Sequence, residues 1–348
     1  MKVGKKAACF LLGVILLAVC TKKQVDASVK RNVTLFIIGD STSKSYHEQD
    51  KATYPREGWG QELPYSFQGA DYMKRQYVPI ENDANVTRYE LPKIGIENWG
   101  KSGATIKSCN ESKRFKKMLS RVRAKDYVMI QFGHNDARKS WGESPNEYER
   151  YLVKMTREIK AKGAVPVFVT SLPQYSTRKY RINAPKYRKK MLHAAKTQGV
   201  FCIDLNEECV NYFNLRGKNV TRNYYMFLKE NQYKSYPKGL RDSTHFRKQG
   251  AAVAARIVAV KMQNNSDKRL NTLTKNLNMN SKSLYKALKK TGKYKKRKYT
   301  SKSWRNLEKA RKQGWITLYS PKKGNQDYKK AEKRLKKAKK NLRKRKTV

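Results

Sequence analysis

Five short apolar runs in the first two thirds of the chain constrain its fold more than any other feature. Each run is continuous, and helical or loop material separates it from the next. Such runs are typical of parallel strands that are buried on both faces. The runs are Val33–Ile38, Ile94–Asn98, Tyr127–Phe132, Val165–Thr170 and Val200–Ile203.

Helical patterns lie between and after these runs. Apolar side chains spaced by three and four residues predict a helix that ends at Lys162-Gly163. These side chains are Tyr148, Tyr151, Leu152, Met155 and Ile159. The Ala- and Val-rich segment Gly250–Met262 predicts a helix that packs on the sheet. Alternating strands and helices predict a doubly wound α/β sheet, in which active sites lie outside the carboxyl ends of the strands.

The first run ends abruptly in Gly39-Asp40-Ser41-Thr42. The glycine permits a tight turn, and the Ser41 hydroxyl then emerges at the carboxyl end of a rigid strand. This is a good position for a nucleophile, although a Ser/Thr helix cap has the same local pattern. We expect Asp40 to shape the turn through hydrogen bonds and not to act in catalysis.

Two later stretches offer donors for a developing oxyanion. The segment 98–108, NWGKSGATIKS, follows the second run, and its Gly103 can present a backbone N–H with no side chain in the way. The segment 131–136, QFGHND, follows the third run, and its Asn135 carries a neutral amide donor. Taken singly, each segment is also typical of an ordinary turn.

A third stretch, Asp242-Ser243-Thr244-His245, supplies an acid–base pair just before the last predicted helix. His245 can accept the proton of a serine hydroxyl, while Asp242 holds the other ring nitrogen and stabilises the imidazolium. The chain has 4 histidines, and the others lack this local carboxylate.

Together these motifs resemble those of the SGNH (GDSL) hydrolase superfamily over Thr34 to Met262. The resemblance makes Ser41, Gly103, Asn135 and His245 the four signature residues and Asp242 the third member of a Ser-His-Asp triad. More narrowly, the chain is similar to the rhamnogalacturonan acetylesterase branch. The residues that carry this similarity are GDST, Gly58-Trp59-Gly60-Gln61, NWGKSGATIKS with Arg114-Phe115, FGHND, Ala161-Lys162-Gly163-Ala164, Thr170-Ser171-Leu172-Pro173, and DSTHF with Gly250-Ala251.

That branch implies a three-layer α/β/α, flavodoxin-like fold with a five-stranded parallel sheet. It also implies hydrolysis of acetyl esters on pectic backbones with neither metal nor other cofactor. The N–H groups of Ser41 and Gly103 and the Asn135 amide would form the oxyanion hole.

The resemblance also bears on substrate binding. Trp59 and Trp99 are candidate sugar-stacking residues, with burial in the core as the alternative. Arg56 and Lys101 are candidates for contact with a substrate carboxylate. Two segments depart from the compact family pattern beside the expected cleft, an insertion at Gly69–Lys93 and a long loop at Asn211–Leu240.

The N-terminus predicts a secretory signal peptide in residues 1–27. Lys2, Lys5 and Lys6 precede the apolar segment Ala7–Cys20, which is short for a membrane span, and Val25-Asp26-Ala27 offers a cleavage site after Ala27. A lipoprotein signal with Cys20 lipidated is the alternative. We therefore expect a secreted or cell-surface protein with no transmembrane segment after cleavage.

The formal net charge of +53 predicts a polyanionic partner. Residues 265–348 hold 31 Lys and Arg against 4 Asp and Glu, so both parts of the chain are basic. Export argues against nucleic acid and leaves anionic polysaccharide, wall polymer or lipid.

Three cysteines remain after signal cleavage, namely Cys109, Cys202 and Cys209. Their odd number argues against a disulfide framework. Cys202 and Cys209 could pair locally, but buried thiols are the expectation.

The composition changes near Asn264, where a hydrolase domain at 28–264 would give way to a polar linker at 265–280 and a helical module at 281–348. Three helical stripes follow the linker: Leu284, Leu288 and Thr291; Trp304, Leu307 and Ala310; Tyr328, Ala331, Leu335, Ala338 and Leu342. The alternative is a disordered basic tail.

This module resembles FIVAR-type modules at Tyr299–Trp304, at Leu307 and Ala310, and along Tyr328–Leu342. Such modules are helical bundles of secreted bacterial surface proteins. The resemblance implies adhesion to anionic cell-wall polymer, which should weaken with salt.

The leading hypothesis is a monomeric secreted serine esterase that removes O-acetyl groups from anionic polysaccharide. One alternative is a lipid-directed esterase of the same superfamily, such as a lysophospholipase. The other is a polyanion-binding surface protein with a vestigial site.

Overall fold

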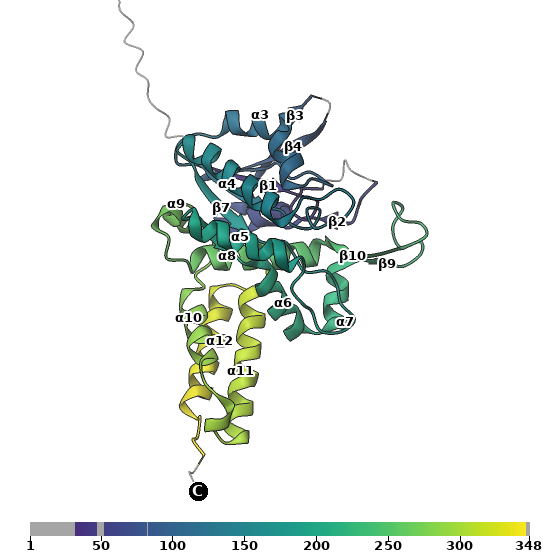
Figure 1. The fold of residues 1–348 in the computed structure, drawn as a ribbon. Helices are drawn as coiled ribbons and strands as arrows, with labels where there is room; N and C mark the ends of the chain where they lie inside the picture. The colour runs from purple at the N-terminus through teal and green to yellow at the C-terminus, as the bar shows by residue number, and fades with distance from the viewer. Residues whose placement is uncertain (1–31, 47–51, 82, 346–348) are drawn as a thin grey trace, which may run out of the picture. The chain divides into compact units, whose positions relative to one another are not determined.

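A seven-stranded sheet of order β3-β4-β5-β1-β6-β7-β8 forms the centre of the fold (Figure 1). The computed structural model describes residues 32–46, 52–81 and 83–345, so the predicted signal peptide lies outside the described residues. Five neighbouring strands are parallel, as the sequence predicts. They are β1 (Thr34–Gly39), β5 (Ile94–Asn98), β6 (Tyr127–Gln131), β7 (Val165–Val169) and β8 (Phe201–Ile203).

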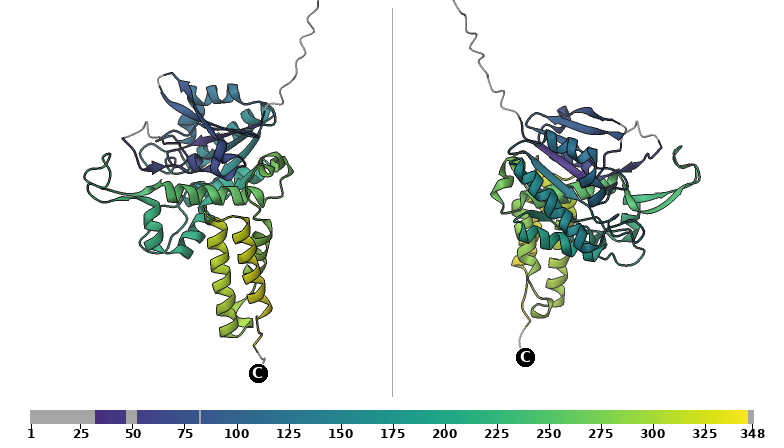
Figure 2. Two further views of the ribbon diagram at one scale, coloured as in Figure 1. Left: turned by 180° about the vertical axis from the view of Figure 1, so that it is seen from behind. Right: turned by 45° about the horizontal axis from the view of Figure 1, so that its top comes forward.

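Helices cover both faces of this sheet (Figures 1 and 2). Alternate residues of β1 supply the two apolar layers, Leu35 and Ile37 to one and Phe36 and Ile38 to the other. The first layer contacts α1 (Trp59–Glu62), α6 (Leu205–Arg216) and α8 (Lys248–Gln263). The second contacts α2 (Ile106–Glu111), α3 (Lys113–Arg121), α4 (Pro145–Ala161) and α5 (Pro185–Thr197). The predicted three-layer α/β/α fold is confirmed.

Helix α4 begins and ends where its sequence predicts. The Ser144 hydroxyl accepts a hydrogen bond from the N–H of Glu147, and the Glu147 carboxylate accepts one from the N–H of Ser144. Gly163 adopts a φ of 70° just past the helix, a conformation that favours glycine. All five predicted apolar positions of α4 are buried.

The predicted insertion Gly69–Lys93 extends the sheet. After the short η1 (Leu63–Ser66) and η2 (Ala70–Tyr72) turns, β3 (Lys74–Ile80) and β4 (Asp83–Leu91) pair antiparallel, and β4 pairs with β5. Most of β3 is solvent-exposed and carries Lys74 and Arg75, so charged side chains protect this open edge.

A second sheet of order β2-β10-β9 brings the start and end of the hydrolase part together. Its strands β2 (Arg56–Glu57), β9 (Tyr225–Leu228) and β10 (Leu240–Arg247) are antiparallel. The predicted long loop therefore contains α7 (Lys218–Thr221), η3 (Arg222–Tyr224) and β9. The motif at 242–245, expected on a loop, lies in β10 at a shift of strand register.

Residues 265–280 differ from the predicted linker because they fold against the hydrolase part. They contain η4 (Lys268–Leu270) and α9 (Asn271–Lys275), and Leu270, Leu273 and Leu277 are buried. The N–H of Asn278 donates to the carbonyl of Ser66 at 2.9 Å. Three spaced leucines among Asn, Lys and Thr thus outweigh the polar composition of the segment.

The C-terminal helices are α10 (Lys282–Gly292), α11 (Ser301–Tyr319) and α12 (Asn325–Lys340), with η5 (Lys296–Lys298) between the first two. Most of the predicted stripe is buried, namely Leu284, Leu288, Thr291, Trp304, Leu307, Tyr328, Ala331 and Leu335. These helices share one apolar cluster with the sheet, α6 and α8. The helical unit is confirmed, but it packs onto the hydrolase part and does not stand apart.

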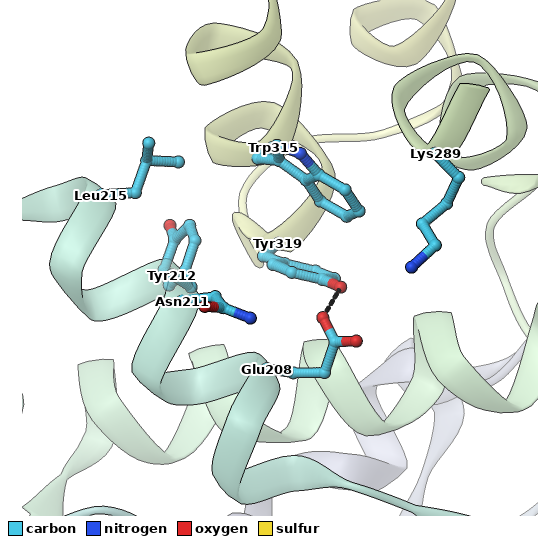
Figure 3. A pocket seen from close by; sticks show the side chains of 7 residues that line it. All are labelled: Glu208, Asn211, Tyr212, Leu215, Lys289, Trp315 and Tyr319. Carbon is cyan, nitrogen blue, oxygen red and sulfur yellow. Dashed lines mark hydrogen bonds between the residues drawn. The ribbon is translucent and has the colours of Figure 1, made fainter. Parts of the chain in front are cut away.

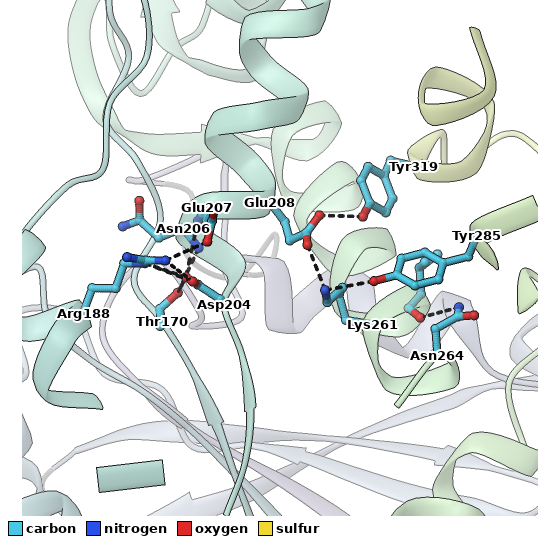
Figure 4. A network of polar contacts seen from close by, with 11 residues as sticks. Thr170, Arg188, Asp204, Asn206, Glu207, Glu208, Lys261, Asn264, Tyr285 and Tyr319 are labelled. Atoms are coloured by element: carbon cyan, nitrogen blue, oxygen red, sulfur yellow. Dashed lines mark hydrogen bonds and ion pairs between the residues drawn. The ribbon is translucent and has the colours of Figure 1, made fainter. Parts of the chain in front are cut away.

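Polar groups join the two parts as well (Figure 4). Glu208 of α6 pairs with Lys261 of α8 at 2.8 Å and accepts the hydroxyl of Tyr319 at 2.8 Å. Lys261 also donates to the Tyr285 hydroxyl at 3.2 Å. Beside this network lies a crevice of about 210 Å³ between α6, α10 and α11, with Trp315 and Lys289 at its walls (Figure 3).

The remaining cysteines, Cys109, Cys202 and Cys209, are free thiols, so the local pairing left open by the sequence does not occur. Burial raises the pKa of Cys109 to about 12, which keeps that thiol protonated. Within the described residues, we find no helix with the length and apolarity needed to cross a membrane.

Candidate active site

The turn after β1 is organised by Asp40. One carboxylate oxygen of Asp40 accepts the N–H and the hydroxyl of Thr42, at 2.8 and 2.7 Å. The Asp40 carbonyl accepts the N–H groups of Ser43 and Lys44, both at 3.2 Å. Asp40 therefore holds the turn that presents Ser41, as the sequence predicts.

The segment Gly58–Gln61 supports the same turn through hydrogen bonds. The N–H of Trp59 donates to the Thr42 carbonyl at 3.0 Å, and Gln61 accepts the N–H of Tyr46 at 2.6 Å. A Cβ at Gly60 would lie 2.4 Å from the Ser43 carbonyl oxygen, so only glycine allows this approach.

The structure contradicts the assignment of Trp59 and Trp99 as sugar-stacking residues. Their side chains are 0% and 1% exposed. The Trp59 indole donates to Gln131 at 3.2 Å, and the Trp99 indole donates to Glu97 at 3.0 Å. Trp59 belongs to the apolar cluster on one face of the sheet and Trp99 to the cluster on the other, so neither ring is available to a sugar.

Ser41, His245 and Asp242 form a continuous hydrogen-bonded chain. Nε2 of His245 lies 2.9 Å from the Ser41 hydroxyl, and Nδ1 lies 2.6 Å from a carboxylate oxygen of Asp242. With its Nδ1 proton donated to Asp242, His245 can accept the hydroxyl proton of Ser41. Strands β1 and β10 thus bring together residues that are far apart in the sequence.

Asp242 is held in its ionised form. Burial raises its pKa, but the hydrogen bond and charge of His245, with the N–H groups of Thr244 and His245, outweigh burial and lower the pKa to about 2. Those two N–H groups donate to one carboxylate oxygen at 2.8 and 3.1 Å. The other oxygen is left for His245.

Arg56, a candidate for substrate contact, lies inside the site. Its guanidinium is 3.8 Å from the Asp242 carboxylate and 5.7 Å from the ring centroid of Tyr46. Lys101 is 52% exposed, and its ammonium pairs with Asp83 at 3.0 Å. A substrate carboxylate at Lys101 would therefore compete with Asp83.

Gly103 and Asn135 lie on the loops that follow β5 and β6. Gly103 has a φ of 76°, and a Cβ built on it would meet no atom within 4 Å. Its backbone thus faces open space. The Asn135 amide donates to the Ala104 carbonyl at 3.0 Å, which fixes the side chain beside Gly103.

Asp136 fixes both loops. Its carboxylate accepts the N–H groups of Ile106 and Gly133, at 2.8 and 2.7 Å. Burial raises the pKa of Asp136 to about 8, the two N–H groups oppose this shift, and the charge of Glu143 adds to it. Burial also lowers the pKa of the neighbouring His134, which favours its neutral form.

Sequence reasoning missed Tyr46. Its hydroxyl donates to the Ser41 carbonyl at 3.0 Å and lies 3.2 Å from the Ser102 hydroxyl, so it links the nucleophile turn to the Gly103 loop. Its position soon after GDST was the available signal, but aromatic residues are too common in loops for this to be specific.

The hydrogen-bonded series Ser41–His245–Asp242 has the geometry needed for acyl transfer through a serine nucleophile. In the part of the chain that the structure describes, no three His, Cys, Asp or Glu side chains gather as metal ligands.

Comparison with known proteins places the chain in a family. A family model described as GDSL-like lipase/acylhydrolase matches residues 35–258. Rhamnogalacturonan acetylesterase RhgT of Bacillus subtilis (strain 168) is 26% identical over 237 residues, which are 66% of this chain and 90% of RhgT. The probable rhamnogalacturonan acetylesterase YesY of the same strain is 27% identical over 232 residues, 65% of this chain and 90% of YesY.

The solved structures agree at the level of the fold. Protein YxiM of Bacillus subtilis superposes with a TM-score of 0.53 at 23% identity, covering 68% of this chain and 58% of YxiM. Because the family model covers more than half of the chain, the protein belongs to the GDSL-like lipase/acylhydrolase family and is a carboxylic ester hydrolase of the SGNH type.

Proposed function

We propose that this protein is a secreted carbohydrate O-acetylesterase that acts on acetylated pectin of the rhamnogalacturonan type. The observation that carries the proposal is the hydrogen-bonded chain Ser41–His245–Asp242 beside Gly103 and Asn135. The names of RhgT and YesY support the acetyl group and the polymer class.

In the proposed reaction, the Ser41 hydroxyl attacks the acetyl carbonyl while His245 takes its proton. The N–H groups of Ser41 and Gly103 and the Asn135 amide stabilise the oxyanion of the tetrahedral intermediate. His245 then gives the proton to the sugar oxygen as its bond to the acetyl carbon breaks, so the sugar leaves with a free hydroxyl and Ser41 carries an acetyl ester. Water, deprotonated by His245, attacks this ester, and acetate leaves as Ser41 regains its proton.

We further propose that the basic C-terminal helices bind an anionic polymer of the cell wall. The three acidic residues of these helices, Glu308, Asp327 and Glu332, each pair with a basic residue of the same helices or of the turn before α12. The many other lysines and arginines therefore keep a strong positive field. Retention on a polyanionic matrix should fall steeply between low and high salt; retention that is independent of salt would contradict the proposal.

Export is part of the same proposal and rests on the sequence of residues 1–27. Mass spectrometry of protein from the culture medium should give an N-terminus at Ser28. A lipidated N-terminus at Cys20 would instead support a lipoprotein.

Acetate release tests the proposed reaction. The protein should release acetate from acetylated pectin, and Ser41→Ala should reduce the rate by at least about 10³-fold because the nucleophile is lost. Ser120→Ala, a change at an exposed serine of α3, is the control. Faster cleavage of long-chain esters would support a lipid-directed esterase, and binding of polyanions without hydrolysis of any ester would support a vestigial site.

A further inference from the structure

The segment between β9 and β10 forms an ordered tip beside the site. This tip, residues 229–239, leads away from the two strands in Figure 1. Its backbone is tied by hydrogen bonds from Asn231 N–H to the Pro237 carbonyl at 2.8 Å and from Tyr236 N–H to the Tyr233 carbonyl at 2.9 Å. The backbone of the tip is therefore folded on itself.

The tip is also attached to the segment that precedes β2. The hydroxyl of Ser235 donates to the backbone carbonyl of Tyr54. The rings of Tyr54 and Tyr233 meet edge to face, with centroids 5.6 Å apart and planes at 73°. Two aromatic rings from separate segments thus contact each other, and we call them the tyrosine pair.

The tyrosine pair is connected to the reacting groups by short stretches of chain. Arg56, two residues after Tyr54, lies 3.8 Å from Asp242. The same β2 residue is aligned with Arg247 of β10, the strand that carries Asp242 and His245. The tyrosine pair is therefore joined through β2 to the strand that carries Asp242 and His245.

The pair can be reached from solvent, and most of the exposed charges on the same segments are positive. Tyr54 is 53% exposed and Tyr233 is partly exposed. Lys234 and Lys238 of the tip and Arg241 of β10 are exposed as well. An apolar ring surface edged by cations suits a sugar ring that carries a carboxylate.

We propose that Tyr54 and Tyr233 form a sugar-binding subsite that stacks a pyranose ring of an anionic polysaccharide next to the acetylated residue. The inference rests on the proposed function and names the part of the surface that selects polymer over small ester. Tyr54 and Tyr233 thus take the stacking role that the sequence assigned to Trp59 and Trp99, which are buried.

The architecture lets the side chains be tested without loss of the tip. Ser235 is bound to the backbone of Tyr54, so Tyr54→Ala keeps that hydrogen bond. Tyr54→Phe keeps the ring as well. Tyr72 is 80% exposed on η2, outside the β2-β10-β9 sheet, and Tyr72→Ala is the matched control for loss of an exposed tyrosine.

Kinetics on two substrates separate the subsite from the reaction. On acetylated pectin, Tyr54→Ala and Tyr233→Ala should each raise KM by roughly 3- to 10-fold with little change in kcat, because a stacking contact is lost. On 4-nitrophenyl acetate, both variants should match the unmodified protein within about twofold. Tyr54→Phe and Tyr72→Ala should match it on both substrates. Unchanged KM on pectin in both Ala variants would overturn the subsite.

If the proposed function is wrong, the unmodified protein itself behaves differently on the two substrates. A protein that cleaves 4-nitrophenyl acetate but releases no acetate from pectin is not a pectin acetylesterase. The subsite is then judged by affinity electrophoresis of Ser41→Ala in gels that contain pectin. Weaker retardation of Ser41→Ala/Tyr54→Ala than of Ser41→Ala supports the subsite, since both variants keep the basic C-terminal helices, and equal retardation overturns it.

Discussion

Proton transfer at the site depends on two neighbouring side chains, Asp242 and His245. The pKa of Asp242 is about 2 in the folded protein, below the ordinary value of 3.8. Asp242 therefore contributes to stability above about pH 4, and this contribution is lost as the pH falls toward 2. Protonation of Asp242 should therefore not limit the rate near neutral pH.

Replacing Asp242 by Asn should leave the fold in place and impair proton transfer. The amide cannot stabilise the imidazolium, and it can hold the His245 ring in the wrong tautomer, so kcat should fall by about 10²- to 10⁴-fold. The measurement is acetate release from pH 4 to pH 9 with circular dichroism as a check on folding. Asp267→Asn, which removes a charge paired with Arg269 in η4, is the control. A rate within threefold of the unmodified protein would remove Asp242 from the mechanism.

Single residues were predictable from sequence where a motif fixes its own geometry. The turn at Asp40–Thr42 is closed by bonds between near neighbours, so GDST alone indicates it. Trp59 and Trp99 were assigned a role that burial excludes, because a sequence does not show which side of a turn an indole occupies. Tyr54 and Tyr233 were missed because the tip and the segment before β2 meet only in the folded chain.

At the scale of elements, β2 and α1 hold a buried acid pair. Burial, the charge of Glu62 and a hydrogen bond with Glu62 raise the pKa of Glu57 to about 8, and Lys248 opposes the shift. The folded pKa thus lies above the ordinary value of 4.5. Stability from this pair is complete below about pH 4.5 and is lost as the pH rises through 8.

Glu57→Gln should flatten the dependence of stability on pH. The amide stays neutral, so the variant should melt at a higher temperature than the unmodified protein at pH 8.5 and at a similar temperature at pH 4.5. Thermal unfolding at both pH values is the measurement. Glu90→Gln, a change at a partly exposed carboxylate of β4, is the control. A constant difference in melting temperature at both pH values would contradict the shifted pKa of Glu57.

Elements were predictable in proportion to their burial. The strands β1, β5 and β6 are buried at every residue, the edge strand β8 is buried only in part, and all five parallel strands appear in the sequence as continuous apolar runs. The β3 strand is exposed along most of its length, and its charged sequence lacks that signal. The β2 and β9 strands are too short to show any period, and they form because β10 lies between them.

At the scale of the whole molecule, the C-terminal helices are held by α6 and α8. Glu208 connects three helices, because this α6 residue binds Lys261 of α8 and the Tyr319 hydroxyl of α11 (Figure 4). Burial lowers the pKa of Lys261, but Glu208 outweighs burial and raises it. The Lys261 charge is therefore stabilised by its partner.

Glu208→Ala should destabilise the protein by about 1–3 kcal/mol, because Lys261 and Tyr319 lose their shared acceptor. Glu207→Ala is the matched control one residue away. Glu207 is 54% exposed and pairs with Arg188, so its loss should cost at most about 1 kcal/mol. Denaturant unfolding measures both variants. Equal stability of the two variants would show that the Glu208 network does not hold the helices.

The separation into a hydrolase domain, a linker and a module was predicted from composition, which reports charge and polarity but not contact. Leu270, Leu273 and Leu277 are few among polar neighbours, and only the folded chain shows the surface they cover. The stripes of the three helices did predict which side chains are buried. They did not predict that one apolar cluster continues from these helices into the sheet.

This continuous cluster makes the basic helices and the ester site thermodynamically linked. In a tethered module, a bound polymer would stabilise only the module. Here the helices and the β1 strand that presents Ser41 contribute to the same apolar cluster, so unfolding one exposes the other. A polyanion that binds only the folded helices would therefore also favour the folded state of the catalytic end, and attachment would protect activity.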